Sequence, residues 1–233
     1  MRREGRDRPE LFSAEEIALL MQATGSRVPS GTSADSANGA VMVEGRRLGQ
    51  GRPRAAIRRG VALLPESRKD QGLVMIRPVR ENVTMAHLDE VSWHGVLQGR
   101  RERERVAEVL RGVDARAASY TMPVSALSGG NQQKAAIAKW LVKTPKVLLA
   151  DEPTRGIDVG AKRAVYALVN ELAAEGLGVL LISSELEEVL GLAHRVLVIR
   201  LGRIVAELAG ADATEENVMR AAFGETRAAG TTP

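Results

Sequence analysis

The chain has 233 residues, of which 44% are hydrophobic and 3% aromatic. That length allows one sizeable domain with an aliphatic core, and the absence of cysteine excludes disulfide bridges and thiolate metal sites. The formal net charge is +4, but the basic residues are scattered and are not interleaved with aromatic residues that could stack on bases, so nucleic acid is not an expected partner.

The N-terminal residues 1–38 differ from the rest of the chain. Residues 14–23 suit a short helix, and residues 25–39 are rich in Gly, Ser and Asn, which are typical of turns and linkers. Residues 1–9 are charged rather than apolar, so they do not resemble a secretory signal. No apolar run in the chain approaches the roughly 18–20 residues that span a bilayer. We expect residues 1–38 to be irregular or disordered, and any membrane role to be peripheral.

The middle of the chain has short apolar segments separated by turn residues. Pro65 ends one apolar run, and the apolar residues of another segment fall on one face of a helix that Gly112 can end. The elements predicted here are a strand at 41–43 with a turn at Gly45, helical turns at 54–59, a strand at 61–64, and helices at 78–85 and 101–112.

The last hundred residues alternate between apolar strands and amphipathic helices. Strands that are apolar throughout predict a parallel sheet covered by helices on both faces. Ligands bind such sheets beyond the carboxyl ends of the strands. The predicted strands are 147–150, 178–182, 195–199 and a hairpin partner at 203–207, and the predicted helices are 131–142, 161–174 and 185–192.

Two adjacent carboxylates follow the apolar run at residues 147–150. Asp151 and Glu152 stand at its carboxyl end, and Pro153 stops the strand. Because successive side chains of a strand point in opposite directions, the two acids cannot share one task. In nucleoside triphosphate hydrolysis, one carboxylate holds Mg²⁺ and a second polarises the attacking water. A strand that simply ends in a polar turn is the alternative interpretation.

A Ser-Gly-Gly sequence opens the helix before this strand. Residues 127–134 read Leu-Ser-Gly-Gly-Asn-Gln-Gln-Lys. Ser128 is a favourable helix cap, the two glycines let a phosphate approach the backbone, and the free amides favour an anion. An ordinary helix cap without a ligand is the alternative.

The order of these motifs resembles the ATP-binding cassette (ABC) ATPases. Leu-Ser-Gly-Gly, a helix, an apolar strand, Asp-Glu-Pro-Thr and then Gly156-Ile157-Asp158 follow one another. Further segments resemble the C-terminal cassette of monosaccharide importers, namely residues 65–69, 132–134, 151–162 and 181–186. The resemblance covers residues 39–224 and implies a P-loop NTPase-like α/β fold, a mostly parallel sheet flanked by helices, with a helical signature subdomain at about 78–143. Residues 225–233 are expected to form a flexible tail.

The resemblance implies roles for individual residues. The signature motif would contact the γ-phosphate of ATP held by a facing subunit, Asp151 would associate with Mg²⁺, and Glu152 would be the general base. Asp158 would lie in the loop that crosses the dimer interface. The nucleotide-binding residues implied in this way are Leu127, Ser128, Gly129, Gly130, Gln132, Glu66, Asp158 and Ser184.

Three features depart from the pattern of many ABC ATPases. Glu66 replaces a glutamine, and Ser184 replaces a switch histidine; both substitutions look typical of the importer subgroup and argue against full catalytic competence. For Glu66, a turn residue at a strand end is the alternative. The third departure is the P-loop, because no Gly-Lys dipeptide occurs in the chain. Residues 25–31 are the nearest Gly-rich stretch, so the expectation is a cassette whose N-terminal portion is missing or replaced.

Three functions remain open at this point. The first is an ATPase subunit that energises a sugar importer, peripheral on the cytoplasmic face of the plasma membrane. Its expected partners are a second cassette, in a homo- or heterodimer, transmembrane permease subunits docking near residues 66–87, and indirectly a periplasmic or extracellular sugar-binding protein. The second is a non-catalytic or relic cassette that supplies only its signature motif. The third is an ABC ATPase acting on DNA or ribosomes, which the importer-like motifs disfavour.

Overall fold

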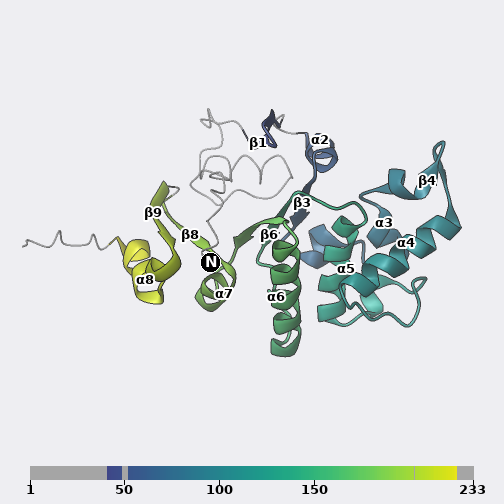
Figure 1. The fold of residues 1–233 in the computed structure, drawn as a ribbon. Helices are drawn as coiled ribbons and strands as arrows, with labels where there is room; N and C mark the ends of the chain where they lie inside the picture. The colour runs from purple at the N-terminus through teal and green to yellow at the C-terminus, as the bar shows by residue number, and fades with distance from the viewer. Residues whose placement is uncertain (1–40, 49–51, 202, 225–233) are drawn as a thin grey trace, which may run out of the picture. The chain divides into compact units, whose positions relative to one another are not determined.

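A computed structural model of the chain describes residues 41–48, 52–201 and 203–224. The expected irregular segment 1–38, the helix at 14–23 and the tail 225–233 lie outside these residues. The chain divides into two compact units (Figure 1), one formed by residues 56–194 and the other by the described residues before Ala56 and after His194.

The first unit is built on a parallel sheet of three strands. β3 (Val61–Leu64), β6 (Val147–Asp151) and β7 (Gly178–Ile182) lie in the order β3-β6-β7. The central strand β6 is buried from Val147 to Ala150 and becomes half-buried at Asp151. A strand covered on both faces must be apolar on both faces, which explains the uninterrupted Val-Leu-Leu-Ala run. The predicted parallel sheet is confirmed.

Helices pack around this sheet and form most of the core. α5 (Gly129–Leu141) contacts β3, α3 (Val79–Thr84), α4 (Gly99–Gly112) and α6 (Val159–Ala174). Its small residues Ala135, Ala136 and Ala138 are fully buried, so neighbouring helices approach it closely. The remaining elements of this unit are α2 (Pro53–Arg58), which begins just before it, η2 (Arg68–Gly72), η3 (Leu88–Val91), β4 (Ser92–Trp93), β5 (Val96–Leu97), η4 (Val124–Ala126) and α7 (Leu186–Leu192).

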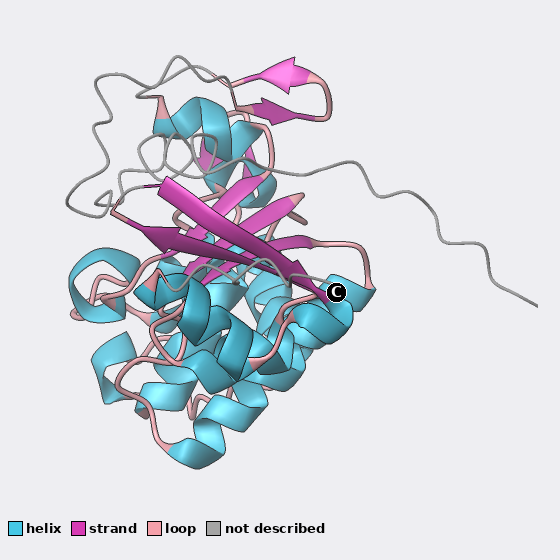
Figure 2. Cartoon of the chain, turned by 90° about the vertical axis from the view of Figure 1, so that its left-hand side faces the viewer, coloured by secondary structure: helices cyan, strands magenta, loops and turns pink. Residues whose placement is uncertain are grey.

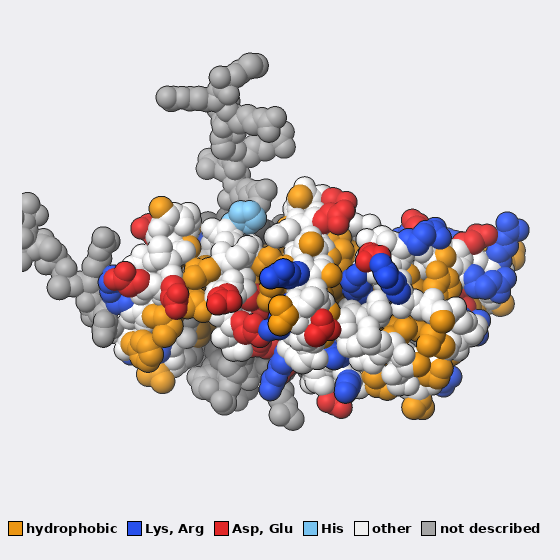
Figure 3. Space-filling model, turned by 90° about the horizontal axis from the view of Figure 1, so that it is seen from below, with side chains coloured by type: hydrophobic (Ala, Val, Ile, Leu, Met, Phe, Trp, Pro, Cys, Tyr) orange, Lys and Arg blue, Asp and Glu red, His pale blue; other side chains and the backbone are white. Residues whose placement is uncertain are grey.

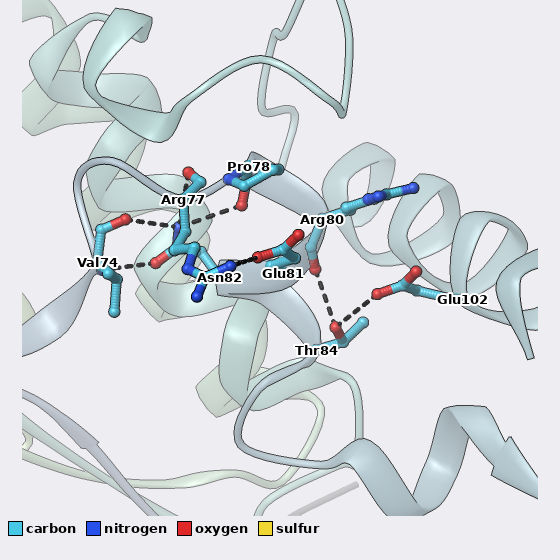
Figure 4. Close-up of polar contacts among 8 residues, drawn as sticks. All are labelled: Val74, Arg77, Pro78, Arg80, Glu81, Asn82, Thr84 and Glu102. Atoms are coloured by element: carbon cyan, nitrogen blue, oxygen red, sulfur yellow. Dashed lines mark hydrogen bonds and ion pairs between the residues drawn. The ribbon is translucent and has the colours of Figure 1, made fainter. Parts of the chain in front are cut away.

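The helix α4 shows how periodicity determines burial. Val106, Val109 and Leu110 are buried, as their spacing predicted. Glu102 is also buried on this helix, and its Oε1 accepts a hydrogen bond from the Thr84 hydroxyl at 3.1 Å (Figure 4). The short hairpin β4–β5 that precedes α4 was not predicted.

The second unit contains two antiparallel pairs. β1 (Met42–Val43) pairs with β2 (Arg46–Arg47), and β8 (Arg195–Arg200) pairs with β9 (Arg203–Ala209), the hairpin predicted from the sequence. Figure 2 draws the antiparallel pairs and the parallel strands alike in magenta. After β9 come η5 (Gly210–Asp212) and α8 (Glu215–Phe223), which packs against β8 and β9 and was not predicted.

The surface and the helix lengths bear on possible partners. On the face shown in Figure 3, Lys and Arg side chains are spread among acidic and hydrophobic side chains and do not gather into one stripe. Among residues 41–48, 52–201 and 203–224, no helix combines the length and the apolar character needed to cross a membrane. The domain limits 39–224 and 78–143 stay predictions.

Candidate functional site

Three of the predicted site segments meet at the carboxyl edge of the parallel sheet. β3 and β6 are in register with Leu64 opposite Ala150, and β6 and β7 with Asp151 opposite Ile182. Glu66, Asp151–Glu152 and Ser184 follow directly from the ends of these three strands. Parallel strands end at the same edge, so the fold brings together carboxylates that are far apart in the sequence.

Glu152 is held in a defined position at this edge. Its φ is 47°, a left-handed conformation that is uncommon for a residue with a side chain. The backbone N–H of Glu152 donates to Ile182 O at 2.8 Å, and its carboxylate Oε1 accepts from the Ser184 N–H at 2.7 Å. One of these hydrogen bonds goes to the last residue of β7, and the other comes from Ser184 just after it. Together they fix the conformation of Glu152. Such local strain often accompanies a positioned functional group.

Asp151 lies beside Glu152 and is half-buried. Burial, and then the negative charge of Glu152, raise the pKa of the Asp151 carboxyl. Both effects disfavour the ionised form, and a bound cation would reverse the second of them. Hard oxygen ligands of this type suit Mg²⁺. Within the part of the chain that the structure describes, no cluster of three or more His, Cys, Asp or Glu side chains could hold a metal by itself.

A buried acid supports the ends of β6 and β7. Glu188, in α7, is 2% exposed and accepts hydrogen bonds from the Thr154 hydroxyl at 3.2 Å and from the Ser183 hydroxyl. Burial raises the pKa of Glu188, while the two hydroxyl donors act in the opposite direction. Glu188 was not singled out in the sequence, because the neighbours on its helix face include Ser184 and Glu185 and do not mark it as buried.

The signature motif forms the start of α5. Ser128 is the N-cap, and its hydroxyl oxygen accepts from the Asn131 backbone N–H at 3.4 Å and from Asn131 Nδ2 at 3.0 Å. Ser128 is exposed, so a ligand or another subunit can reach it. A Cβ added at Gly130 would lie 2.7 Å from the Ala161 Cβ, so α6 leaves room for glycine only.

Two predicted nucleotide-binding residues face inward at this helix end. Leu127 is 8% and Gln132 5% exposed. The Gln132 Nε2 donates to Leu127 O at 2.9 Å, and its Oε1 accepts from Arg68 Nε at 3.3 Å. The Gln132 amide is therefore occupied by contacts within the chain.

The remaining predicted residues lie around the loop at 155–158. Asp158 is exposed and caps α6, its Oδ1 accepting from the Ala161 N–H at 2.9 Å. Glu66 forms an ion pair with Arg155. Gly129 adjoins this loop, because a Cβ placed there would lie 3.7 Å from Ile157 Cγ2 and 3.8 Å from Gly156 O. The Gly-rich stretch 25–31 lies outside the described residues.

A buried asparagine shapes the loop between η2 and α3, and the sequence did not single it out. Asn82 is fully buried; its Oδ1 accepts from the Val74 N–H at 2.7 Å, and its Nδ2 donates to three carbonyls, those of Val74, Arg77 and Pro78 (Figure 4). The same loop leaves Val74 42% and Ile76 83% exposed. Val74 and Ile76 thus present apolar side chains to solvent from a loop that Asn82 holds in place.

Comparison with known proteins gives this geometry a context. The sequence profile of the ABC transporter family matches residues 27–155, more than half of the chain, including the signature motif and the paired acids. The chain belongs to the ABC transporter family. The named family also accounts for the order of the strand-end acids and the capping serine.

Curated relatives and solved structures agree with that assignment. The ribose import ATP-binding protein RbsA of Rhodococcus jostii (strain RHA1) is 48% identical over 192 residues, which cover 82% of this chain and 38% of the relative. The protein of the same name from Geobacillus kaustophilus (strain HTA426) is 43% identical over 189 residues, covering 81% of this chain and 38% of the relative. The chain thus spans 38% of the length of these ABC proteins.

Solved structures show the ABC fold. A nucleotide-free ATP-binding cassette superposes with a TM-score of 0.67 at 22% identity, covering 88% of this chain and 79% of that chain. A dimeric post-hydrolysis state of the cassette MJ0796 bound to ADP and Pi superposes with a TM-score of 0.60 at 21% identity, covering 74% and 73%. Both confirm the predicted fold class.

Proposed function

We propose that the chain is the ATP-binding and hydrolysing part of an ABC importer for a sugar. The observation that supports this proposal most directly is the position of Glu152 at the end of β6. Its carboxylate accepts a hydrogen bond from the Ser184 N–H, and it lies next to the half-buried Asp151. The names of the relatives, ribose import ATP-binding proteins, support the substrate class.

The site chemistry assigns a separate task to each acid. Asp151 would hold Mg²⁺, through water, and the ion would neutralise phosphate charge when bound. Glu152 would accept a proton from the attacking water, since its carboxylate is half-exposed at the strand end and oriented by Ser184. Both acids serve the nucleotide held on this chain's own side.

The signature motif would serve a second nucleotide, held by a facing cassette. Ser128 is exposed at the N-terminus of a 13-residue helix, where free amides and the helix dipole favour phosphate. Gly129 and Gly130 leave the backbone accessible. This arrangement requires a partner cassette, identical or different, with ATP between the two. The dimeric form of MJ0796 is consistent with such pairing.

Permease subunits would dock on the loop at residues 74–77. Asn82 fixes this loop with four hydrogen bonds, and Ile76 projects from it with 83% of its surface exposed. A rigid apolar projection loses little conformational entropy on binding. The chain would then sit on the cytoplasmic face of the membrane and be linked through the permease to a sugar-binding protein outside.

The test is to measure the Mg-ATP affinity of the purified chain, and its ATP turnover after mixing with an intact ABC cassette. Binding in the micromolar range and turnover that requires Glu152 are expected. Failure of both to appear would overturn the proposal. Stimulation of the partner that requires Ser128 but not Glu152 would contradict the hydrolytic role and show a cassette that supplies only its signature motif, an outcome that the missing Gly-Lys dipeptide makes important to test.

A further inference from the structure

The short helical segment η2 lies between the signature helix and the loop that follows the paired acids. It begins two residues after Glu66, and its first residue is Arg68. Arg68 is separated from Gln132 by 64 positions and from Arg155 by 87. Contacts over such separations depend on the fold and have no local signature in the sequence.

The Arg68 guanidinium bridges two elements with three hydrogen bonds. Its Nε donates to Gln132 Oε1 at 3.3 Å, its Nη1 to Arg155 O at 3.0 Å and its Nη2 to Gly156 O at 3.1 Å. A planar fork with five donors can satisfy acceptors in this arrangement, whereas the ammonium of lysine acts as a point charge. Partial burial lowers the pKa of Arg68, yet a guanidinium keeps its charge at physiological pH.

On the helix side, the contact reaches the signature motif through Gln132. The buried Gln132 amide accepts from Arg68 at one end and donates to Leu127 O at the other. Arg68 also adjoins the motif itself, because a Cβ added at Gly129 would lie 3.1 Å from Arg68 Nη2. The guanidinium is therefore packed against the first turn of α5.

On the loop side, Arg68 holds the residues that connect Glu152 to Asp158. The Arg155 N–H donates to Glu152 O at 3.1 Å, so the carbonyls that Arg68 binds belong to the turn that begins at Glu152. The side chain of Arg155 also forms an ion pair with Glu66, just before η2. Two links thus join the segment after β3 to this turn.

The segment η2 is anchored at its other end as well. The Lys139 ammonium, 7% exposed, donates to Gly72 O at 2.7 Å. Lys139 lies seven residues after Gln132, about two turns along α5, and so on the same helix face. The segment η2 therefore lies along α5 and is held by Gln132 at one end and by Lys139 at the other.

We propose that Arg68 is a positioning residue that fixes the signature motif, residues 127–130, relative to the loop at 155–158 of the same chain. It acts through Gln132 and two backbone carbonyls. The signature motif and the loop carrying Asp158 both face a partner cassette under the proposed function, on which this role rests. One guanidinium thereby determines how the two surfaces are presented together.

Arg105, a residue of α4, provides a matched control because it contacts the C-terminal end of α5, opposite the end that Arg68 contacts. Its Nε and Nη2 donate to Val142 O, and Nη2 also donates to Leu141 O, at 2.7–3.1 Å. Like Arg68, it is a partly buried arginine that binds carbonyls next to α5. Arg105→Met should therefore perturb the helix C-terminus and leave the signature motif and the loop unchanged.

The first measurement is hydrogen exchange of the purified chain by mass spectrometry. Arg68→Met should speed exchange in peptides covering 127–132 and 154–161 by about tenfold, since the three hydrogen bonds from the charged guanidinium to these segments are lost. Arg68→Lys keeps the positive charge but not the planar guanidinium, and it should behave similarly. It tests the proposal even if the Met variant fails to fold. Wild-type exchange rates in both variants, or equal effects of Arg105→Met on these peptides, would overturn the proposal.

The second measurement is ATP turnover of the chain paired with an intact cassette. Arg68→Met and Arg68→Lys should lower kcat by about tenfold, with KM for ATP changed less than about twofold, because misplaced groups slow the reaction without removing nucleotide contacts. Arg105→Met should leave both constants unchanged. An unchanged kcat in both Arg68 variants would contradict the role. If the wild-type pair shows no turnover, the hydrolytic part of the proposed function fails, and the exchange measurement alone decides the role of Arg68.

Discussion

The Oε1 atom of Glu152 accepts a hydrogen bond from the backbone N–H of Ser184 at 2.7 Å. Because the donor is a main-chain group, the contact does not depend on the side chain at position 184. Serine in place of the switch histidine expected from many ABC ATPases therefore leaves this orientation of the acid intact. What the replacement removes is an imidazole that could itself take part in proton transfer.

Glu152→Gln is expected to abolish ATP turnover of the paired cassettes while leaving ATP association intact. Glutamine keeps an oxygen that can accept from Ser184 but cannot accept the proton of the attacking water, and a general base contributes about 10²–10⁴-fold. Steady-state turnover and equilibrium ATP binding check this. Glu175→Gln, the same change at the exposed end of α6, should have no effect. Normal turnover of Glu152→Gln would show that another group is the base.

Ser128→Arg is expected to block ATP-dependent closure of the cassette pair. Ser128 is an exposed cap, and arginine would place a long cationic side chain where the facing phosphate must approach. Loss of the cap alone should lower the free energy of unfolding by about 0.5–2 kcal/mol. Ser128→Ala loses the same cap without added bulk, so it separates stability from closure. Sedimentation with Mg-ATP measures pairing; a closed Ser128→Arg pair would remove the signature assignment.

The ends of the strands could be predicted because they depend on residues that are neighbours in the sequence. Uninterrupted apolar runs ended by Pro65 and Pro153 predicted β3 and β6, and parallel strands necessarily bring Glu66, Asp151 and Glu152 to one edge. The same periodicity argument located the buried face of α4. These features depend on neighbours within a few positions, which a sequence displays directly.

At the start of α5 two sequence signals disagreed. The apolar periodicity predicted a helix from Asn131, whereas Ser128 was predicted as the cap, and the helix does begin at Gly129, directly after Ser128. Glycine lowers intrinsic helix propensity, yet the close approach of Ala161 admits no larger residue at Gly130. The connections through Arg68 and Glu188 were not predictable either, because their partners come together only in the folded chain.

Gly130→Ala is expected to destabilise the chain by about 1–3 kcal/mol, since its Cβ would lie 2.7 Å from Ala161 Cβ and α5 would have to move away from α6. Urea unfolding measures the loss. Gly112→Ala, at the end of α4 with open space around the added Cβ, should be neutral or slightly stabilising because alanine favours helix. Equal stabilities of the two variants would contradict the close α5–α6 packing.

Lys139 is expected to make stability depend on pH in the alkaline range. Burial lowers its pKa to about 8, whereas an unfolded lysine has a pKa of about 10.4. Between these values the unfolded chain holds a proton that the native chain has released, so the contribution of Lys139 to the free energy of unfolding rises with pH, by at most about 1.4 kcal/mol per pH unit.

The comparison that isolates this contribution is wild type against Lys139→Met in urea unfolding from pH 7.5 to 10.5. Methionine fills similar space but cannot donate to Gly72 O, so the variant should be less stable, and its deficit should grow as the pH rises through about 8. Lys69→Met, at an exposed position of η2, should follow the wild type across the range. A deficit of constant size would mean that Lys139 keeps its proton in the native chain, and that burial beneath η2 does not disfavour the ammonium.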